Sequence, residues 1–339
     1  MKLLVVLCSI LSLISANSRS CNLPDIEGFD EKTLARAAHN IVSKVSEAPS
    51  GSVVVVCSKD KENLAIWITH ELEKQRIPYS LFNLGDKSNS DVARIQSLIK
   101  DGTGKRGFIF LIQLVDASFL FENVGRPDTG LKISNEYLFC DWLMSTPGLI
   151  RLFSADADEL EDFRTSLLKE ITDTREIHIT TEKGTDIRIV PRSWIVADGE
   201  IFTAPVESKT NGTIFVDGCA YMGPPKKPFL LRIDNGRVIN VSYLDLTDKQ
   251  QKYAQKDLTR DNNSNVLAEI GIGTSISSRW DADMMESEQA RGTCHFGFGR
   301  NIMFKGGKNE SSYHFDLVIR KPTIIVDGKC ICKNGKFLF

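Results

Sequence analysis

Two histidines and one aspartate near the C-terminal end of the chain have the residue types of a metal site. His314 and Asp316 stand two residues apart in a strand-like run. Because side chains alternate along a strand, this imidazole and this carboxylate would point to the same face. His295 lies in a strand-like segment spaced by glycines, which let a ligand or another backbone come close. Two histidines and one aspartate are a minimal open site for Zn²⁺, Fe²⁺, Mn²⁺ or Co²⁺.

Two glutamates extend this candidate site. Glu269 interrupts the apolar run from Val266 to Ile272, and Glu200 precedes the apolar pair Ile201-Phe202. A carboxylate buried there is costly without a partner, and a cation is one such partner. The alternative interpretation is that the glutamates form edge-strand salt bridges and that the histidines form structural hydrogen bonds.

The first half of the chain alternates strand-like and helix-like patterns. Near-continuous apolar strands between amphipathic helices predict a parallel sheet covered by helices on both faces. No Gly-x-Gly-x-x-Gly turn follows the first predicted strand, where Ser58-Lys59-Asp60 stands instead, and no Walker-type motif occurs, so a nucleotide-binding role is not indicated. The predicted elements are strands 52–57, 78–84 and 107–114 and helices 62–74, 91–100 and 156–171, the last expected to close this layer.

After about residue 175 the pattern changes to short β-branched runs separated by turn dipeptides. Lys183-Gly184, Asn235-Gly236 and Asp327-Gly328 each join two such runs, which predicts three hairpins. One helical stretch, 247–259, interrupts them. The sequence therefore predicts an α/β protein with an N-terminal parallel-sheet α/β domain at 21–175. An α+β metal-binding domain rich in antiparallel hairpins follows at 176–339.

The N-terminus is typical of a secretory signal peptide at residues 1–16. Lys2 precedes an apolar run that ends at Ile14, short of the roughly 20 residues needed to cross a bilayer. A secreted protein without a membrane span is expected, with an uncleaved anchor as the alternative. The formal net charge of −2 is not massed in blocks, so neither nucleic acid nor an anionic membrane is indicated as a partner.

Secretion gives meaning to two further features. Seven cysteines follow residue 16, an odd number, so at least one is expected to be free or paired between chains. N-glycosylation is expected at Asn-x-Ser/Thr sequons in a eukaryotic host. The four sequons begin at Asn211, Asn240, Asn262 and Asn309.

Four segments, in order and approximate spacing, resemble the aminopeptidase T / aminopeptidase S family of thermophilic metallo-aminopeptidases. The resemblance covers roughly residues 30 to 335 and is specific in the second half. The segments are 199–205 (GEIFTAP), 267–271 (LAEIG), 292–299 (GTCHFGFG) and 312–316 (SYHFD).

The resemblance implies two divalent metal ions, with Zn²⁺, Co²⁺ or Mn²⁺ expected. It assigns Glu200, Glu269 and His295 to one ion and Glu269, His314 and Asp316 to the other, so that Glu269 bridges them and is the candidate catalytic residue. It also implies a homodimer and a peptide substrate that is cleaved from its N-terminus. We therefore expect a metal-dependent aminopeptidase-like hydrolase.

Two alternatives follow from the same comparison. A branch of the superfamily resembles 2,5-dihydroxypyridine dioxygenases, which hold one Fe²⁺ and carry a histidine at the position of Glu269; such an enzyme would act on a small molecule. The peptidases carry a catalytic tyrosine where this chain has Ile302, so a secreted, non-catalytic metal-binding protein is the other alternative. Tyr313 or Arg300 could take over that tyrosine's role in stabilising an oxyanion.

Overall fold

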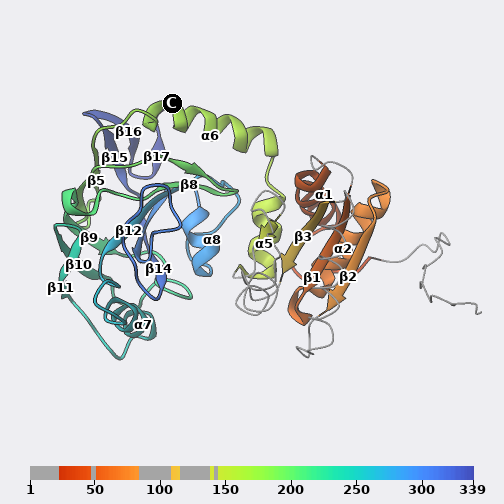
Figure 1. Cartoon of the computed structure of the whole chain (residues 1–339), viewed down its shortest axis with the longest axis horizontal. Coiled ribbons are helices and arrows are strands. Elements are labelled where there is room, and N and C mark those ends of the chain that lie inside the picture. Colours follow the sequence, from red (N-terminus) through yellow and green to blue (C-terminus); the bar gives the residue numbers. More distant parts are fainter. Residues whose placement is uncertain (1–22, 47–50, 84–107, 115–137, 141–143) are drawn as a thin grey trace, which may run out of the picture.

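The computed structural model describes residues 23–46, 51–83, 108–114, 138–140 and 144–339 (Figure 1). Within them the chain has the predicted mixed α/β class, with one parallel sheet and two antiparallel sheets. The signal peptide, Cys21 and the helix predicted at 91–100 lie outside the described residues. No helix among those described is long and apolar enough to cross a membrane.

The N-terminal part is built on a four-stranded parallel sheet in the order β2-β1-β3-β4. β1 lies in the middle because its run of valines is apolar on both faces, with Val55 paired to Leu81 on one side and Ile112 on the other. The strands are β1 (Gly51–Cys57), β2 (Tyr79–Asn83), β3 (Phe108–Leu114) and β4 (Leu138–Cys140). The helices are α1 (Glu31–Ser46), α2 (Glu62–Lys74) and α5 (Thr146–Phe153), with a 3₁₀ turn at Lys59–Lys61.

The C-terminal part holds two antiparallel sheets. An eight-stranded sheet runs β11-β10-β9-β6-β5-β15-β16-β17, and a five-stranded sheet runs β14-β13-β12-β8-β7. The strands of the first sheet are β5 (Ile177–Thr180), β6 (Asp186–Ile189), β9 (Asn211–Val216), β10 (Phe229–Asp234), β11 (Arg237–Ser242), β15 (Thr323–Val326), β16 (Lys329–Lys333) and β17 (Lys336–Phe337). Those of the second are β7 (Ile195–Val196), β8 (Glu200–Thr203), β12 (Leu267–Gly273), β13 (Thr293–Gly299) and β14 (His314–Arg320).

All three predicted hairpins are confirmed. β5 pairs with β6, β10 with β11 and β15 with β16. Asn235 and Asp327 adopt φ values of 49° and 46°, and each is followed by a glycine at positive φ. Two successive residues at positive φ form the turn whose twist suits a two-residue hairpin, which is why these dipeptides are a strong signal.

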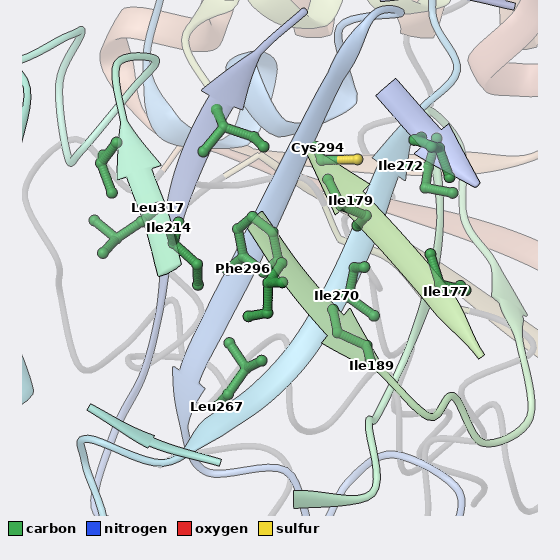
Figure 2. Close-up of a cluster of buried hydrophobic side chains, with 14 of the residues drawn as sticks. Ile177, Ile179, Ile189, Ile214, Leu267, Ile270, Ile272, Cys294, Phe296 and Leu317 are labelled. Carbon is green, nitrogen blue, oxygen red and sulfur yellow. The ribbon is translucent and has the colours of Figure 1, made fainter. Parts of the chain in front are cut away.

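The main hydrophobic core lies between the two antiparallel sheets (Figure 2). Ile177, Ile179 and Ile189 extend from the eight-stranded sheet toward Ile270 and Phe296 of the five-stranded sheet. One face of the five-stranded sheet is thereby used for packing, and its opposite face is free to carry polar side chains.

Helix α6 (Ala157–Ile171) corrects one prediction. Its N-terminus is where the sequence placed it, capped by the carboxylate of Asp156. Its apolar residues Leu167 and Ile171, however, pack into the core of the C-terminal part, and Trp194 Nε1 donates to the Ile171 carbonyl oxygen. The expectation that this helix closes the first layer is therefore wrong. An amphipathic pattern specifies an apolar stripe but not its packing partner.

Two further helices complete the C-terminal part, α7 (Lys249–Leu258) and the short α8 (Met284–Gln289), with a 3₁₀ turn at Glu207–Lys209. Helix α7 corresponds to the helical stretch predicted at 247–259, and its Ala254 and Leu258 join the core. Helix α8 was not predicted, and it lies beside the five-stranded sheet on the side of α5 (Figure 1). Among the cysteines whose side chains the structure describes, Cys57, Cys219, Cys294, Cys330 and Cys332 are free.

Candidate metal centre

The five predicted side chains come together on the five-stranded sheet. Four neighbouring strands deliver them: β8 carries Glu200, β12 carries Glu269, β13 carries His295, and β14 carries His314 and Asp316. Glu200, Glu269 and His295 are at most 9% exposed. Ligand atoms of Glu200, Glu269 and His295 lie within 4.8 Å of one another, as do those of Glu269, His314 and Asp316.

Strand alternation explains why these side chains share one face. On β13, Cys294 and Phe296 enter the hydrophobic core, so His295 between them points to the other side. On β12, Leu267 and Ile270 both enter the core, although they are three residues apart. A register shift between Leu267 and Glu269 accommodates this arrangement. Such a bulge re-aims a side chain and here turns Glu269 away from the core.

Every one of the five side chains is paired across the sheet with a glycine. Glycine leaves an open space on the face where its neighbour's side chain lies. A β-carbon on Gly271 would come 1.8 Å from Cε1 and 2.1 Å from Nε2 of His295. The pairs are Glu200 with Gly273, Glu269 with Gly297, His295 with Gly271, His314 with Gly299 and Asp316 with Gly297.

This spacing makes Gly271→Ala a sharp test of the geometry. The added methyl group would overlap the His295 imidazole, so the variant is expected to lose metal affinity and to unfold at a lower temperature than the parent. The double variant Gly271→Ala/His295→Ala should regain thermal stability but not metal binding, because the space is then vacated. Melting curves and metal titrations of both variants check this, and a single variant that binds metal like the parent would contradict the geometry.

Glu269 lies between the two imidazoles. Its Oε1 is 3.4 Å from Nε2 of His295, and its Oε2 is 3.1 Å from Nε2 of His314. A second carboxylate flanks each imidazole: Glu200 Oε2 is 3.3 Å from His295 Nε2, and Asp316 Oδ1 is 3.3 Å from His314 Nε2. The arrangement is thus two histidine-carboxylate pairs joined by one shared carboxylate.

The electrostatics of this cluster favour positive charge. Burial alone would lower the pKa of His295, but the carboxylates of Glu200 and Glu269 outweigh it and raise that pKa to about 9. Burial would likewise lower the pKa of His314, but the carboxylates of Asp316 and Glu269 outweigh it and hold that pKa well above its usual range. Burial raises the pKa of Glu200 to about 7, although His295 acts in the opposite direction.

Three possible ligand atoms of this cluster make no hydrogen bond. Among the described residues, Glu200 Oε2, Asp316 Oδ1 and His295 Nδ1 are buried and make no hydrogen bond. Buried polar atoms are normally satisfied, and a role in binding an ion is one reason for an exception. His314 Nδ1, by contrast, is 2.7 Å from the Arg300 carbonyl oxygen, the usual second contact of a metal-binding imidazole. The residues present therefore fit a divalent cation.

Sequence reasoning missed one member of the cluster, Glu288 on α8. This residue is 4% exposed, and one of its carboxylate oxygens lies within 4.8 Å of ligand atoms of His295 and Asp316. In the sequence it belongs to the short polar run Glu286–Gln289. No local pattern in the sequence distinguishes it as a ligand.

The rim beside His314 is aromatic. Phe304 meets the His314 ring edge-on at 5.6 Å and packs against Phe202 at 5.1 Å. Ile302, at the position of the family tyrosine, is 40% exposed in a turn closed by the hydrogen bond from Phe304 N to Asn301 O. This rim offers no hydroxyl group at that position.

Tyr313 does not replace the missing tyrosine in this structure. Its ring stacks on Phe315 at 6.3 Å and beneath the guanidinium group of Arg260 at 4.0 Å. Phe315 belongs to the core face of β14, opposite His314. Tyr313 therefore lies on the side of the strand that faces away from the cluster.

Two comparisons with known proteins give matches. The model of the 2,5-dihydroxypyridine 5,6-dioxygenase family, NicX, matches residues 191–339, which contain all the cluster residues. The fold is similar to that of wild-type AmpT (aminopeptidase T) from Thermus thermophilus, with a TM-score of 0.60 and 12% identity over 91% of this chain and 99% of that chain. No curated protein matches the sequence. The structural match shows a shared fold, and the family model matches the segment that carries the cluster.

Proposed function

We propose that this protein is a metal-dependent aminopeptidase-like hydrolase with a dinuclear centre. The observation that carries the proposal is the position of Glu269, whose two oxygens each face a different imidazole. A carboxylate placed in this way can bridge two ions, one beside His295 and Glu200 and the other beside His314 and Asp316. Two-metal hydrolases hold their ions about 3.5–4 Å apart.

Charge supports two ions rather than one. The cluster contains four carboxylates, of Glu200, Glu269, Glu288 and Asp316, against two imidazoles. With both imidazoles neutral, as metal ligands must be, two divalent cations balance the four negative charges. A single divalent cation leaves two buried negative charges without compensation, which is costly away from water.

The chemistry of hydrolysis would be divided among these residues. Divalent ions bound here would polarise a peptide carbonyl group and lower the pKa of a water molecule. Glu269 holds the ions in position and, as the carboxylate between them, is our candidate acceptor for the water's proton. The aromatic rim of Phe304 and Phe202 bounds the site on the His314 side.

A mononuclear Fe(II) dioxygenase-like enzyme is the second candidate, favoured by the match to the dihydroxypyridine dioxygenase family. Its iron would lie at His314 and Asp316, where one imidazole and one carboxylate are 3.3 Å apart. In a mononuclear site Glu269 would take the place of that family's histidine beside His314 and Asp316, and Glu200 and His295 would have no metal ion to bind. The dinuclear interpretation accounts for Glu200 and His295 as well, and for this reason we prefer it.

Turnover assays separate the two functions. The protein, loaded in turn with Zn²⁺, Co²⁺, Mn²⁺ and Fe²⁺, is expected to hydrolyse aminoacyl amides with a free amino group and to spare their N-acetylated counterparts. Glu269→Gln protein prepared in parallel controls for contaminating peptidases. Oxygen consumption with 2,5-dihydroxypyridine and Fe²⁺, without hydrolysis of any amide, would establish the dioxygenase instead. Metal binding without either activity would indicate a non-catalytic protein.

We further propose that the protein is secreted and acts as a homodimer. The signal peptide at 1–16 supports secretion, and the resemblance to the aminopeptidase family supports the dimer. In the proposed arrangement the N-terminal α/β domain at 21–175 is a scaffold and the C-terminal domain at 176–339 carries the metal centre. The metals are Zn²⁺, Co²⁺ or Mn²⁺ and the substrate is a peptide.

Secretion through a eukaryotic pathway should leave a specific glycosylation pattern. Asn211, Asn240 and Asn262 are exposed and are expected to carry N-glycans. Asn309 is expected to remain bare, because its Nδ2 donates both hydrogens, to the carbonyl oxygens of Asn263 at 2.9 Å and Gly299 at 2.6 Å. Peptide mapping after treatment with an amidase checks each site, and N-terminal sequencing should find a start near Asn17. A glycan on Asn309 or a mature chain beginning at Met1 would contradict the respective claim.

A further inference from the structure

Helix α8 touches both parts of the protein. Met285 packs against the hydrophobic cluster of the N-terminal part. Glu288, three residues later, belongs to the candidate metal cluster on the five-stranded sheet. Figure 1 shows α8 between that sheet and α5. A helix of six residues is too short to be stable in isolation, so its position depends on what holds it.

The N-terminal part holds α8 through a buried ion pair. Arg151 of α5 donates from Nε and a terminal nitrogen to the two oxygens of Glu286, both at 2.6 Å. The Glu286 side chain is fully buried, and the Arg151 side chain is 24% exposed. Bidentate pairs of this kind fix the orientation of the carboxylate as well as its position.

A second contact fixes the start of the helix. Asp283 caps α8 by accepting from the backbone nitrogen of Glu286 at 3.1 Å, and its other oxygen accepts from the backbone nitrogen of Ser145 at 3.1 Å. Ser145 is itself the N-cap of α5. The two helices approach closely, because a β-carbon on Gly148 of α5 would lie 2.9 Å from Glu286 Oε2.

Glu286 and Glu288 lie on nearly opposite sides of α8. Two residues along an α-helix are about 200° apart around its axis, so side chains at these positions face nearly opposite directions. Glu286 faces α5, and Glu288 faces the cluster of His295 and Asp316. Anything that fixes Glu286 therefore fixes how far Glu288 reaches toward the cluster.

We propose that the Arg151–Glu286 ion pair is a positioning device through which the N-terminal part of the protein sets the metal affinity of the C-terminal site, by holding Glu288 in place. The inference rests on the proposed metal centre. It adds a role in that centre for the N-terminal part, which supplies none of the proposed ligands. Arg151 is a positioning residue, since it contacts no member of the cluster directly.

A double-mutant cycle tests the proposal with Co²⁺ as the probe, followed through its visible absorption bands and by competition with a chelator. Arg151→Met is expected to weaken Co²⁺ binding about 10-fold to 100-fold, the usual loss when a partner outside the ligand set is removed. In a Glu288→Gln background the same change should alter Co²⁺ affinity less than about twofold, because the Arg151–Glu286 ion pair then has no carboxylate to hold near the cluster. Arg188→Met is the control, since it removes a 2.6 Å ion pair to Glu176 elsewhere in the C-terminal part.

Further measurements keep the result interpretable. Glu286→Gln breaks the ion pair without leaving a buried charge, so it should reproduce the Arg151→Met effect even where the latter variant folds poorly. Melting of the metal-free proteins separates lost stability from lost affinity. Equal losses from Arg151→Met in both backgrounds, or unchanged affinity in Arg151→Met and Glu286→Gln, overturn the positioning role while the metal centre stands. A parent that binds no Co²⁺ overturns both proposals.

Discussion

Replacing Glu269 by glutamine is expected to empty both metal positions, whereas replacing Glu200 by glutamine should leave one ion bound. Glu269 faces both imidazoles, while Glu200 lies beside His295 alone. Glutamine keeps the shape of the side chain but removes the charge that a cation needs. Metal content per chain after gel filtration checks the difference.

The two glutamine variants control for each other. Both remove one buried carboxylate from the same face of the same sheet, so a general loss of fold would affect both and would be visible in the melting of the metal-free proteins. Equal metal content in the two variants would count against the bridging role of Glu269, and with it against a dinuclear centre.

His314→Ala and Asp316→Asn are each expected to empty one metal position and so to reduce the response of thermal stability to added metal. A ligand stabilises only the state that binds it, by about 2.7 kcal/mol at a free concentration of 100 times Kd. The parent should therefore melt at a lower temperature after chelation, and the variants, which can hold only the ion beside Glu200 and His295, should show a smaller shift on chelation than the parent.

A purely structural role for His314 and Asp316 predicts a different result. If His314 and Asp316 are only a buried hydrogen-bonded pair, each substitution leaves a polar group unsatisfied and costs roughly 1–3 kcal/mol. Metal content would then stay at the level of the parent. Variants that keep the parent's full response to the chelator would remove both residues from the metal centre.

Local patterns in the sequence were enough to predict much of the fold. The valine run of β1 and the turn dipeptides Asn235-Gly236 and Asp327-Gly328 act over a few residues, through burial on both faces of a strand and through positive φ. The packing of α6 could not be predicted in this way, because its apolar stripe fits either core. The tertiary structure alone decides that Leu167 and Ile171 enter the C-terminal one.

Local patterns likewise predicted only part of the candidate site. His314 and Asp316 could be predicted to share a face from strand alternation alone. Glycine spacing and the neighbouring apolar runs indicated His295, Glu269 and Glu200, and the resemblance assigned all five residues to two ions. The pairing of each of the five residues with a glycine depends on the register between strands, which local sequence patterns do not predict. Glu288 was missed because its burial arises from contacts between α8 and the sheet, and a short polar helix gives no sign of them.

The central claim is that Glu269 bridges two metal ions. An anomalous-scattering experiment on crystals grown with Zn²⁺ tests it directly, since each bound ion appears as a separate peak at a position that needs no assumption about the ligands. We expect two peaks about 3.5–4 Å apart, one beside Glu200 and His295 and the other beside His314 and Asp316, with Glu269 between them. A single peak, or none in this cluster, would contradict it.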